Sequence, residues 1–265
     1  MTPVRRAFFD SPLGQAHYVE AGEPTGIPVV LLHQTPRSTD EFAEVVPLFS
    51  TKRWTIALDT PGYGCSDPVA GEPTIEDYAS VVLSLARHLG APTIDLVGHH
   101  TGALIAVECA AKAPDEIRRI VLSGPMFMDE RTRLDLARHF SQWTIQPGGG
   151  HLTEKWKRFA AWTKDDALVQ RLVVDLFRAG PQSEQGHFAV VKYQMENRAP
   201  LVRCPILLLY ARGDLFSMPD ENRRLLRSAF PEAAEAVIDG SVFIANESPV
   251  AFAKAAIEFL EGGLS

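Results

Sequence analysis

One short segment combines ionisable side chains with the glycine spacing of a sharp strand-to-helix turn. It is Gly98-His99-His100-Thr101-Gly102, and it lies between an apolar run and a run of small and apolar residues. Glycines at these positions permit a tight turn and a close approach of helix to strand. This is the shape of a nucleophile elbow, which lifts its central residue above the sheet. Here that residue is His100, whose imidazole changes protonation near neutral pH and suits general acid–base chemistry.

Four further segments resemble motifs of the α/β-hydrolases, in that family's order and spacing. They are an H-G-x-P-like oxyanion loop at 31–36, a D-x-P-G-x-G-x-S turn at 59–67, an acid-bearing strand and loop at 207–214, and a segment at 243–249 that follows the family's triad histidine. The chain therefore resembles an α/β-hydrolase with a helical cap. The resemblance implies a mostly parallel central β-sheet flanked by helices, with an inserted helical cap that roofs a pocket for a small molecule.

The chain departs from that family at two of the three triad positions. The family has a Ser, Cys or Asp nucleophile where this chain has His100, and a histidine base where it has Val242. Only the acid position is retained, as Asp214. A triad mechanism needs a deprotonatable nucleophile and an aligned histidine base. The sequence therefore argues against ester hydrolysis through an acyl-serine.

The oxyanion loop differs from the family as well. Gln34 occupies the place of the glycine in H-G. The resemblance maps the two backbone donors of the oxyanion hole to Thr35 and Thr101, both of which carry N–H groups. We expect these donors to stabilise a developing enolate or oxyanion.

The two triad substitutions suggest a replacement for the lost base. An imidazole reaches farther from the backbone than a serine hydroxyl, and Val242 leaves the former histidine site without a ring. We therefore expect the ring of His100 to approach Asp214 and form a dyad, with His100 as general base and Asp214 as its orienting acid. The opposite interpretation is a decayed elbow in which His100 is tolerated and Asp214 only caps its loop.

Further residues near these motifs are candidates for the substrate pocket. Arg37 follows the oxyanion loop, where it is suited to an anionic or carbonyl-bearing ligand. The whole set is His33, His99, Arg37, Trp143 and Val242. We expect no metal site, because His99 and His100 are adjacent rather than spaced i, i+4 on a helix. We expect no cofactor either, since the chain has no dinucleotide fingerprint or P-loop.

The elements that must position these residues follow from the hydrophobic pattern. Runs at 5–9 and 15–20 flank a turn and predict a hairpin. Apolar runs at 29–33, 55–59, 93–98, 119–123, 206–211 and 234–238 predict strands, and the segments 39–49, 75–89, 101–112, 219–229 and 249–260 predict helices. This alternation is typical of parallel β/α crossovers. We expect an α/β-hydrolase core at 1–124 and 200–265, interrupted by a helical cap at 125–199.

Composition narrows the classes of partner. The chain has 265 residues, with 26 Lys and Arg against 33 Asp and Glu, which is a formal charge of −7. No basic surplus is available to replace phosphate counterions, so we expect neither a nucleic acid nor a membrane as partner. Three cysteines are not a disulfide framework, and no apolar segment follows the N-terminal residues, so a cytoplasmic location is expected. The oligomeric state stays open, a homodimer included.

Three functions fit these observations. The first is cofactor-independent acid–base chemistry of the lyase, decarboxylase, isomerase or cyclase type on a small, apolar, carbonyl-containing substrate, with His100 as base. The second is a ligand-binding pseudo-hydrolase without catalysis. The third is a hydrolase in which His100 activates water directly.

Overall fold

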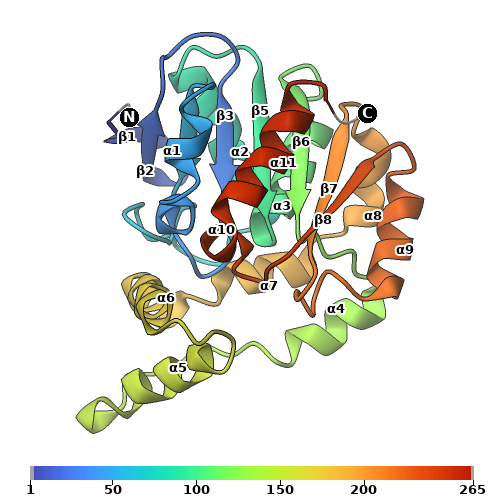
Figure 1. Cartoon of the computed structure of the whole chain (residues 1–265). Coiled ribbons are helices and arrows are strands. Elements are labelled where there is room, and N and C mark those ends of the chain that lie inside the picture. Colours follow the sequence, from blue (N-terminus) through green and yellow to red (C-terminus); the bar gives the residue numbers. More distant parts are fainter. Residues whose placement is uncertain (1–2, 264–265) are drawn as a thin grey trace.

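The core of the molecule is an eight-stranded sheet in the order β1-β2-β4-β3-β5-β6-β7-β8 (Figure 1). The computed structural model describes residues 3–263. The strands are β1 (Arg5–Ser11), β2 (Gly14–Ala21), β3 (Val29–Leu32), β4 (Thr55–Leu58), β5 (Ile94–His99), β6 (Ile117–Ser123), β7 (Ile206–Ala211) and β8 (Ala234–Ile238). The β1–β2 and β2–β4 pairs are antiparallel, and all other pairs are parallel. The predicted hairpin and the six predicted later strands are confirmed, with shifts of one or two residues at several ends.

Helices cover both faces of this sheet, with α1 and α11 on one face and α2 and α3 on the other (Figure 1). Their bounds are η1 (Thr39–Phe42), α1 (Val46–Phe49), α2 (Ile75–His88), α3 (Thr101–Lys112), α9 (Asp220–Ala229), α10 (Ile244–Glu247) and α11 (Pro249–Leu260). Successive strand residues point to opposite faces, so each strand feeds two separate apolar cores. Leu31 packs in the core with α11, whereas Leu32 packs in the core with α2 and α3.

The single helix predicted at 39–49 is wrong. The structure has instead the short 3₁₀ helix η1 and the four-residue helix α1. Ser38 caps η1, because its side chain accepts a hydrogen bond from the Asp40 N–H. Pro47 lies in the first turn of α1. Because proline has no backbone N–H, it cannot donate the hydrogen bond that would continue the helix from η1, but it is well suited to the first turn of a new helix.

All helices from α4 to α8 lie in the segment between β6 and β7, which we call the cap. Their bounds are α4 (Glu130–Ala137), η2 (Pro147–Gly149), α5 (Gly150–Ala160), α6 (Asp166–Ala179), η3 (Gly180–Gln182), α7 (Gln185–Lys192), α8 (Met195–Arg198) and η4 (Ala199–Leu201). In Figure 1, α4 to α7 lie beyond the ends of the parallel strands, below the sheet. Ligands of open α/β sheets bind at the carboxyl ends of the strands. Within residues 3–263 no helix has the length and apolar character needed to cross a membrane.

Candidate active site

The elbow holds His100 in a strained backbone conformation. β5 ends at His99 and α3 begins at Thr101, and between them His100 has φ 47° and ψ −108°. Within residues 3–263 it is the only non-glycine residue with a positive φ. A Cβ atom at Gly102 would lie 2.0 Å from the carbonyl oxygen of Leu32, so helix and strand approach closely only because this residue is glycine. Strain of this kind persists where the surrounding structure enforces it.

The side chain of His100 contacts Asp214, as the sequence predicts. Its Nε2 lies 2.9 Å from Oδ2 of Asp214, with the His100 side chain 11% exposed and the Asp214 side chain 1% exposed. Gly124, which follows β6, makes room for this pair. A Cβ atom there would lie 2.7 Å from Nε2 of His100 and 3.0 Å from Oδ2 of Asp214. The His–Asp contact therefore depends on a glycine far away in the sequence.

Asp214 is held as an ionised acceptor. Its Oδ1 accepts the backbone N–H of Phe216 at 2.9 Å, and its Oδ2 accepts the hydroxyl of Ser217 at 2.5 Å. Burial alone would raise the pKa of Asp214, but the charge and hydrogen bond of His100, together with these donors, hold the pKa well below its ordinary value. The carboxylate is thus charged at neutral pH and fixes the orientation of the imidazole.

The other ring nitrogen of His100 is available to a ligand. A carboxylate only accepts, so the Nε2 facing Asp214 carries a proton, and in the neutral ring Nδ1 keeps its lone pair. Nδ1 has no hydrogen-bond partner within residues 3–263, but this atom is not buried. It is therefore reached by solvent, and His100 lines a cavity of about 430 Å³. An oriented imidazole with an open lone pair has the geometry of a general base.

The two backbone N–H groups expected to form the oxyanion hole differ in whether they already donate a hydrogen bond. Thr101 is the first residue of α3, so its N–H has no acceptor within the helix. The N–H of Thr35 instead donates to the hydroxyl of Thr101 at 3.3 Å. Within residues 3–263 the N–H of Thr101 has no acceptor, while the N–H of Thr35 is engaged by a long hydrogen bond that a ligand oxygen would have to replace.

Gln34 and His99 hold the segment that has lost the family's histidine. Nε2 of Gln34 donates to the carbonyl oxygen of Val242 at 3.0 Å, and Nε2 of His99 lies 2.9 Å from the same oxygen. Nδ1 of His99 contacts the hydroxyl of Ser123 at 2.9 Å. Burial lowers the pKa of His99, which favours the neutral ring. Both residues therefore position Val242, and Gln34 also lines the cavity, whereas His99 does not.

Val242 lines the cavity as predicted, but three other predicted pocket residues lie outside it. His33 bridges the Gln34 carbonyl and the Thr60 N–H, at 2.8 and 3.0 Å, and His99 is enclosed as described above. Trp143 donates to the hydroxyl of Ser183 at 3.0 Å and stacks on His151. Each of these rings has its polar atoms satisfied within the protein, so packing explains its position.

Arg37 does line the cavity, but its guanidinium is engaged elsewhere. Nε donates to Asp175 of α6 at 2.7 Å, and the other nitrogens donate to Asn246 and Asp40 at 3.0 and 3.1 Å. Its side chain is 1% exposed. Arg37 therefore joins the oxyanion loop to the cap, and its charge is already balanced by the carboxylates of Asp175 and Asp40.

The remaining cavity walls come mostly from the cap and are mostly apolar. The lining residues are Gln34, Thr35, Pro36, Arg37, His100, Thr101, Leu104, Met126, Leu136, His139, Phe140, Arg158, Phe159, Trp162, Leu172, His187, Val190, Phe216, Val242 and Phe243. Trp162 stacks on Phe216 with ring centroids 5.3 Å apart, and Phe216 meets the His100 ring edge to face. The sequence contains no signal for these aromatic pairs, because they join segments that are far apart in the chain.

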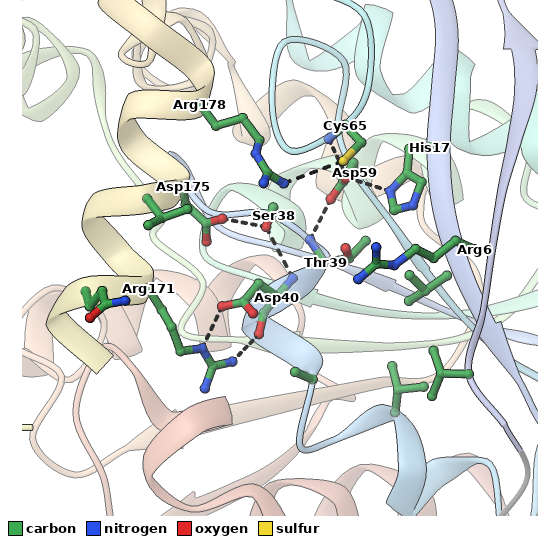
Figure 2. Close-up of a pocket in the computed structure, with 16 residues that line it drawn as sticks. Arg6, His17, Ser38, Thr39, Asp40, Asp59, Cys65, Arg171, Asp175 and Arg178 are labelled. Carbon is green, nitrogen blue, oxygen red and sulfur yellow. Dashed lines mark hydrogen bonds and ion pairs between the residues drawn. The ribbon is translucent and has the colours of Figure 1, made fainter. Parts of the chain in front are cut away.

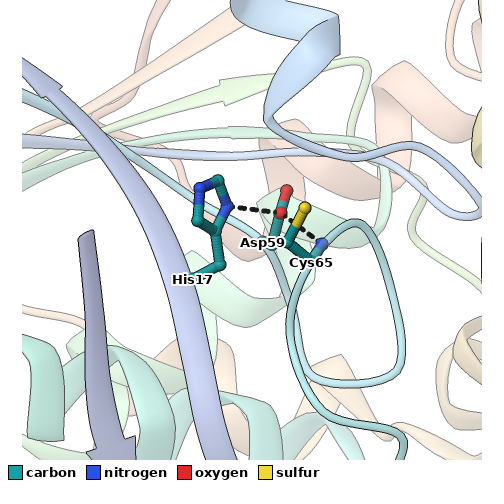
Figure 3. A group of neighbouring side chains, drawn as sticks. All are labelled: His17, Asp59 and Cys65. Atoms are coloured by element: carbon teal, nitrogen blue, oxygen red, sulfur yellow. Dashed lines mark hydrogen bonds and ion pairs between the residues drawn. The ribbon is translucent and has the colours of Figure 1, made fainter. Parts of the chain in front are cut away.

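One cluster has the residue types of a metal site, although none is predicted from the sequence. His17, Asp59 and Cys65 bring ligand-type atoms within 4.8 Å of one another (Figure 3). Asp59 already accepts hydrogen bonds from Nδ1 of His17 at 2.7 Å and from the backbone N–H groups of Cys65 and Thr39 at 2.8 and 2.6 Å. These bonds explain the cluster as an anchor for the turn after β4.

The fold and the elbow define the class of this protein. The family model described as alpha/beta hydrolase fold matches residues 27–247. The chain belongs to this family. Its expected fold class and family are thereby confirmed.

Relatives that are similar in sequence carry the names of enzymes. "(E)-2-((N-methylformamido)methylene)succinate hydrolase" of Acinetobacter baylyi is 32% identical over 110 residues, which is 41% of each chain. "Haloalkane dehalogenase 2" of Mycobacterium tuberculosis is 29% identical over 126 residues, 47% of this chain and 43% of that one. The alignments thus span less than half the length of these relatives.

A solved structure is similar to nearly the whole chain. The enol-lactonase from Burkholderia xenovorans LB400 superposes with a TM-score of 0.79 at 22% identity, covering 96% of this chain and 100% of that one. At this identity the likeness concerns the fold.

Proposed function

We propose that this chain is a cofactor-independent enzyme in which His100, oriented by Asp214, acts as general base on a small, largely apolar, carbonyl-containing substrate. One observation carries the proposal. Nε2 of His100 lies 2.9 Å from the Asp214 carboxylate while Nδ1 has no partner within residues 3–263. The base is therefore oriented on one side and open on the other, beside the free N–H of Thr101.

The proposed step is proton transfer from a carbon next to the carbonyl. Nδ1 of His100 takes the proton, and the electron pair of the broken C–H bond moves onto the carbonyl oxygen as an enolate. The Thr101 N–H stabilises the developing negative charge, and Asp214 stabilises the imidazolium. Return of the proton to another atom completes an isomerase reaction, and loss of a β leaving group from the enolate completes a lyase reaction. In a cyclase reaction the enolate carbon instead forms a bond to an electrophilic carbon of the same substrate. In a decarboxylation, loss of CO2 itself supplies the electron pair of the enolate, and protonated His100 then returns a proton to the carbon.

A hydrolase in which His100 activates water is the second candidate. Its support is that relatives carry the names of a hydrolase and a dehalogenase. In this mechanism Nδ1 takes a proton from water, and the resulting hydroxide adds to the carbonyl carbon. Collapse of the tetrahedral adduct then breaks the bond to the leaving oxygen, which takes the proton back from His100. The same dyad serves both candidates, so the two differ only in whether the proton comes from carbon or from water.

Deuterium exchange tests the proposal without a known substrate. Small ketones and β-keto esters are incubated with the protein in D2O, and loss of the α-proton signal is followed by NMR. We expect protein-catalysed exchange that His100→Ala abolishes. Protein-catalysed hydrolysis of an ester or enol lactone without α-exchange, also lost in His100→Ala, would support the water-activating hydrolase instead. Binding of these ketones without exchange or hydrolysis would support the pseudo-hydrolase.

A fluorophosphonate probe separates these candidates from a relocated serine. Labelling of the wild-type protein by the probe, with loss of activity, would overturn both dyad mechanisms. We expect no labelling, because His100 stands where the family has its nucleophile.

A further inference from the structure

A second cavity, of about 530 Å³, lies between the antiparallel edge of the sheet and helix α6 of the cap (Figure 2). Its walls come from β1, β2, η1, the turn after β4, and α6. The lining residues are Val4, Arg6, His17, Val19, Ser38, Thr39, Asp40, Ala43, Val46, Asp59, Cys65, Gln170, Arg171, Val174, Asp175 and Arg178. Apart from contributing Asp175 as a partner of Arg37, this cavity has no role in the proposed chemistry.

The three carboxylates of this cavity are all engaged. Asp59 accepts from His17 and two backbone N–H groups, as described above. Asp175 accepts from Arg37 and from the hydroxyl of Ser38, both at 2.7 Å. Asp40 accepts from Arg37 at 3.1 Å and from Arg171 at 2.7 Å. A cationic ligand would therefore compete with the donors that these carboxylates already bind.

Two arginines that line this cavity lack strong partners. Arg6 makes no hydrogen bond or ion pair within the described part of the chain, and Arg178 makes only a 3.5 Å contact from its guanidinium to Sγ of Cys65. Figure 2 shows these two arginines reaching toward the cavity from β1 and from α6. The unengaged charge of this cavity is therefore positive.

His17 supplies a second, independent observation. Its ring is 4% exposed and lines the cavity, and its Nε2 is buried with no partner within residues 3–263. Arg6 is opposite Val19 in the β1–β2 register, and Val19 is two residues from His17, so Arg6 and His17 lie on the same face of the hairpin. Nδ1 of His17 faces the carboxylate of Asp59 and therefore carries the proton, so Nε2 of the neutral ring is a buried acceptor without a donor. An unpaired buried acceptor is costly, and an O–H or N–H group of a ligand in this corner would satisfy it.

We propose that this second cavity binds a small organic anion, with its carboxylate or phosphate between Arg6 and Arg178 and an apolar body inside. Val19, Ala43, Val46 and Val174 supply the apolar wall. Both arginines are exposed, so they lie at the mouth of the cavity and receive the charged end of the ligand. Arginine is suited to this role because its planar fork binds carboxylate and phosphate oxygens in pairs.

A metal ion fits the same place less well. A cation at His17, Asp59 and Cys65 would have to displace the hydrogen bonds that Asp59 accepts. It would also lie near the guanidinium of Arg178, which already contacts Sγ of Cys65. The metal cation and the guanidinium of Arg178 would repel each other, so the positive charge of the cavity favours an anion.

Titration of the full-length, ¹⁵N-labelled protein with phenyl phosphate, benzoate, inorganic phosphate and benzyl alcohol tests the proposal. We expect phenyl phosphate or benzoate to shift the backbone amide signals of Thr39, Cys65 and Val174, and the stronger of the two identifies the preferred anion. Inorganic phosphate should bind more weakly, because it lacks an apolar body. Equal binding of benzyl alcohol, or shifts confined to the Thr101 and Phe216 amides of the His100 cavity, would overturn the proposal.

Three variants locate the site. Arg6→Ala and Arg178→Ala should each raise the dissociation constant on the order of tenfold, which corresponds to the loss of a charge-assisted hydrogen bond. Arg5→Ala is the matched control, since Arg5 is also exposed on β1 but does not line the cavity. Equal affinity in all three variants would contradict the site. Stoichiometric binding of Zn²⁺ with shifts at His17 and Cys65, and no anion binding, would replace it with a metal site.

Discussion

At the scale of single residues, the proposed chemistry depends on the contact between His100 and Asp214. His100 lies at the turn between β5 and α3, and its Nε2 is 2.9 Å from Oδ2 of Asp214. In the proposed mechanism this ring takes the role of the histidine base expected from the resemblance. This arrangement argues against drift, because Gly124 and Ser217 are both placed to support it.

Asp214→Asn tests the orienting role of the acid. The amide cannot stabilise the imidazolium, so we expect α-proton exchange to slow on the order of a hundredfold or more. Circular dichroism should show that the fold is kept. An unchanged exchange rate in the folded variant would show that His100 works without its partner.

Gly124→Ala tests the space that the dyad needs. Gly124 has φ +59°, and an added Cβ would lie 2.7 Å from Nε2 of His100. Gly26→Ala is a matched control, because Gly26 has φ +71° but no atom within 4 Å of an added Cβ. We expect both variants to lose about 1 kcal/mol in the free energy of unfolding from the positive φ. Only Gly124→Ala should also lose activity; equal activity in both would argue that the site tolerates displacement of the ring.

At the scale of elements, the cap is joined to the oxyanion loop by one buried ion pair. Arg37 follows that loop, and Asp175 lies on α6, with side chains 1% and 4% exposed. The pair forms part of the boundary between the two cavities, since Arg37 lines one and Asp175 lines the other. The position of α6 and the shape of the active-site cavity are therefore coupled.

Asp175→Asn tests this connection. Loss of one partner leaves a buried guanidinium with less compensation, so we expect a loss of about 3 kcal/mol in the free energy of unfolding. The measurement is urea denaturation followed by tryptophan fluorescence. Asp166→Asn is the control, because it changes an exposed residue on the same helix and should cost only a few tenths of a kcal/mol. Equal losses of unfolding free energy in the two variants would mean that the ion pair does not contribute to stability.

At the scale of the whole molecule, two buried histidines make stability depend on pH. Burial lowers the pKa of His33 and of His99. Below about pH 6.5 these two histidines are therefore protonated in the unfolded chain, while they stay neutral in the folded protein down to a lower pH. Protons then favour the unfolded state, so stability is greatest above that pH and is lost as the pH falls through it.

Urea denaturation at pH 7.5 and 5.5 measures this effect. We expect the midpoint to fall at the lower pH. His88→Gln, a change at an exposed histidine, should leave the difference intact. If His99→Gln kept the full difference as well, the pH dependence would have to come from other groups.

The sequence by itself determined the fold. Hydrophobic runs and glycine turns are local signals, and they placed the strands and the turn at His100. The break at Pro47, which divides the helix predicted at 39–49, is a local feature too. The approach of His100 to Asp214 was also predictable, because a known framework fixes which loops meet.

Only the tertiary structure decided which polar residues face the cavities. His33, His99 and Trp143 were expected in the pocket, yet each satisfies its hydrogen bonds inside the protein. Trp162 is one of several cap aromatics that the sequence indicates only as a group of possible pocket residues, whereas Phe216 and the second cavity with Arg6 and Arg178 had no signal in the sequence. The direction of a side chain and the partner that engages it depend on contacts between distant segments. Residue type and spacing do not determine those contacts.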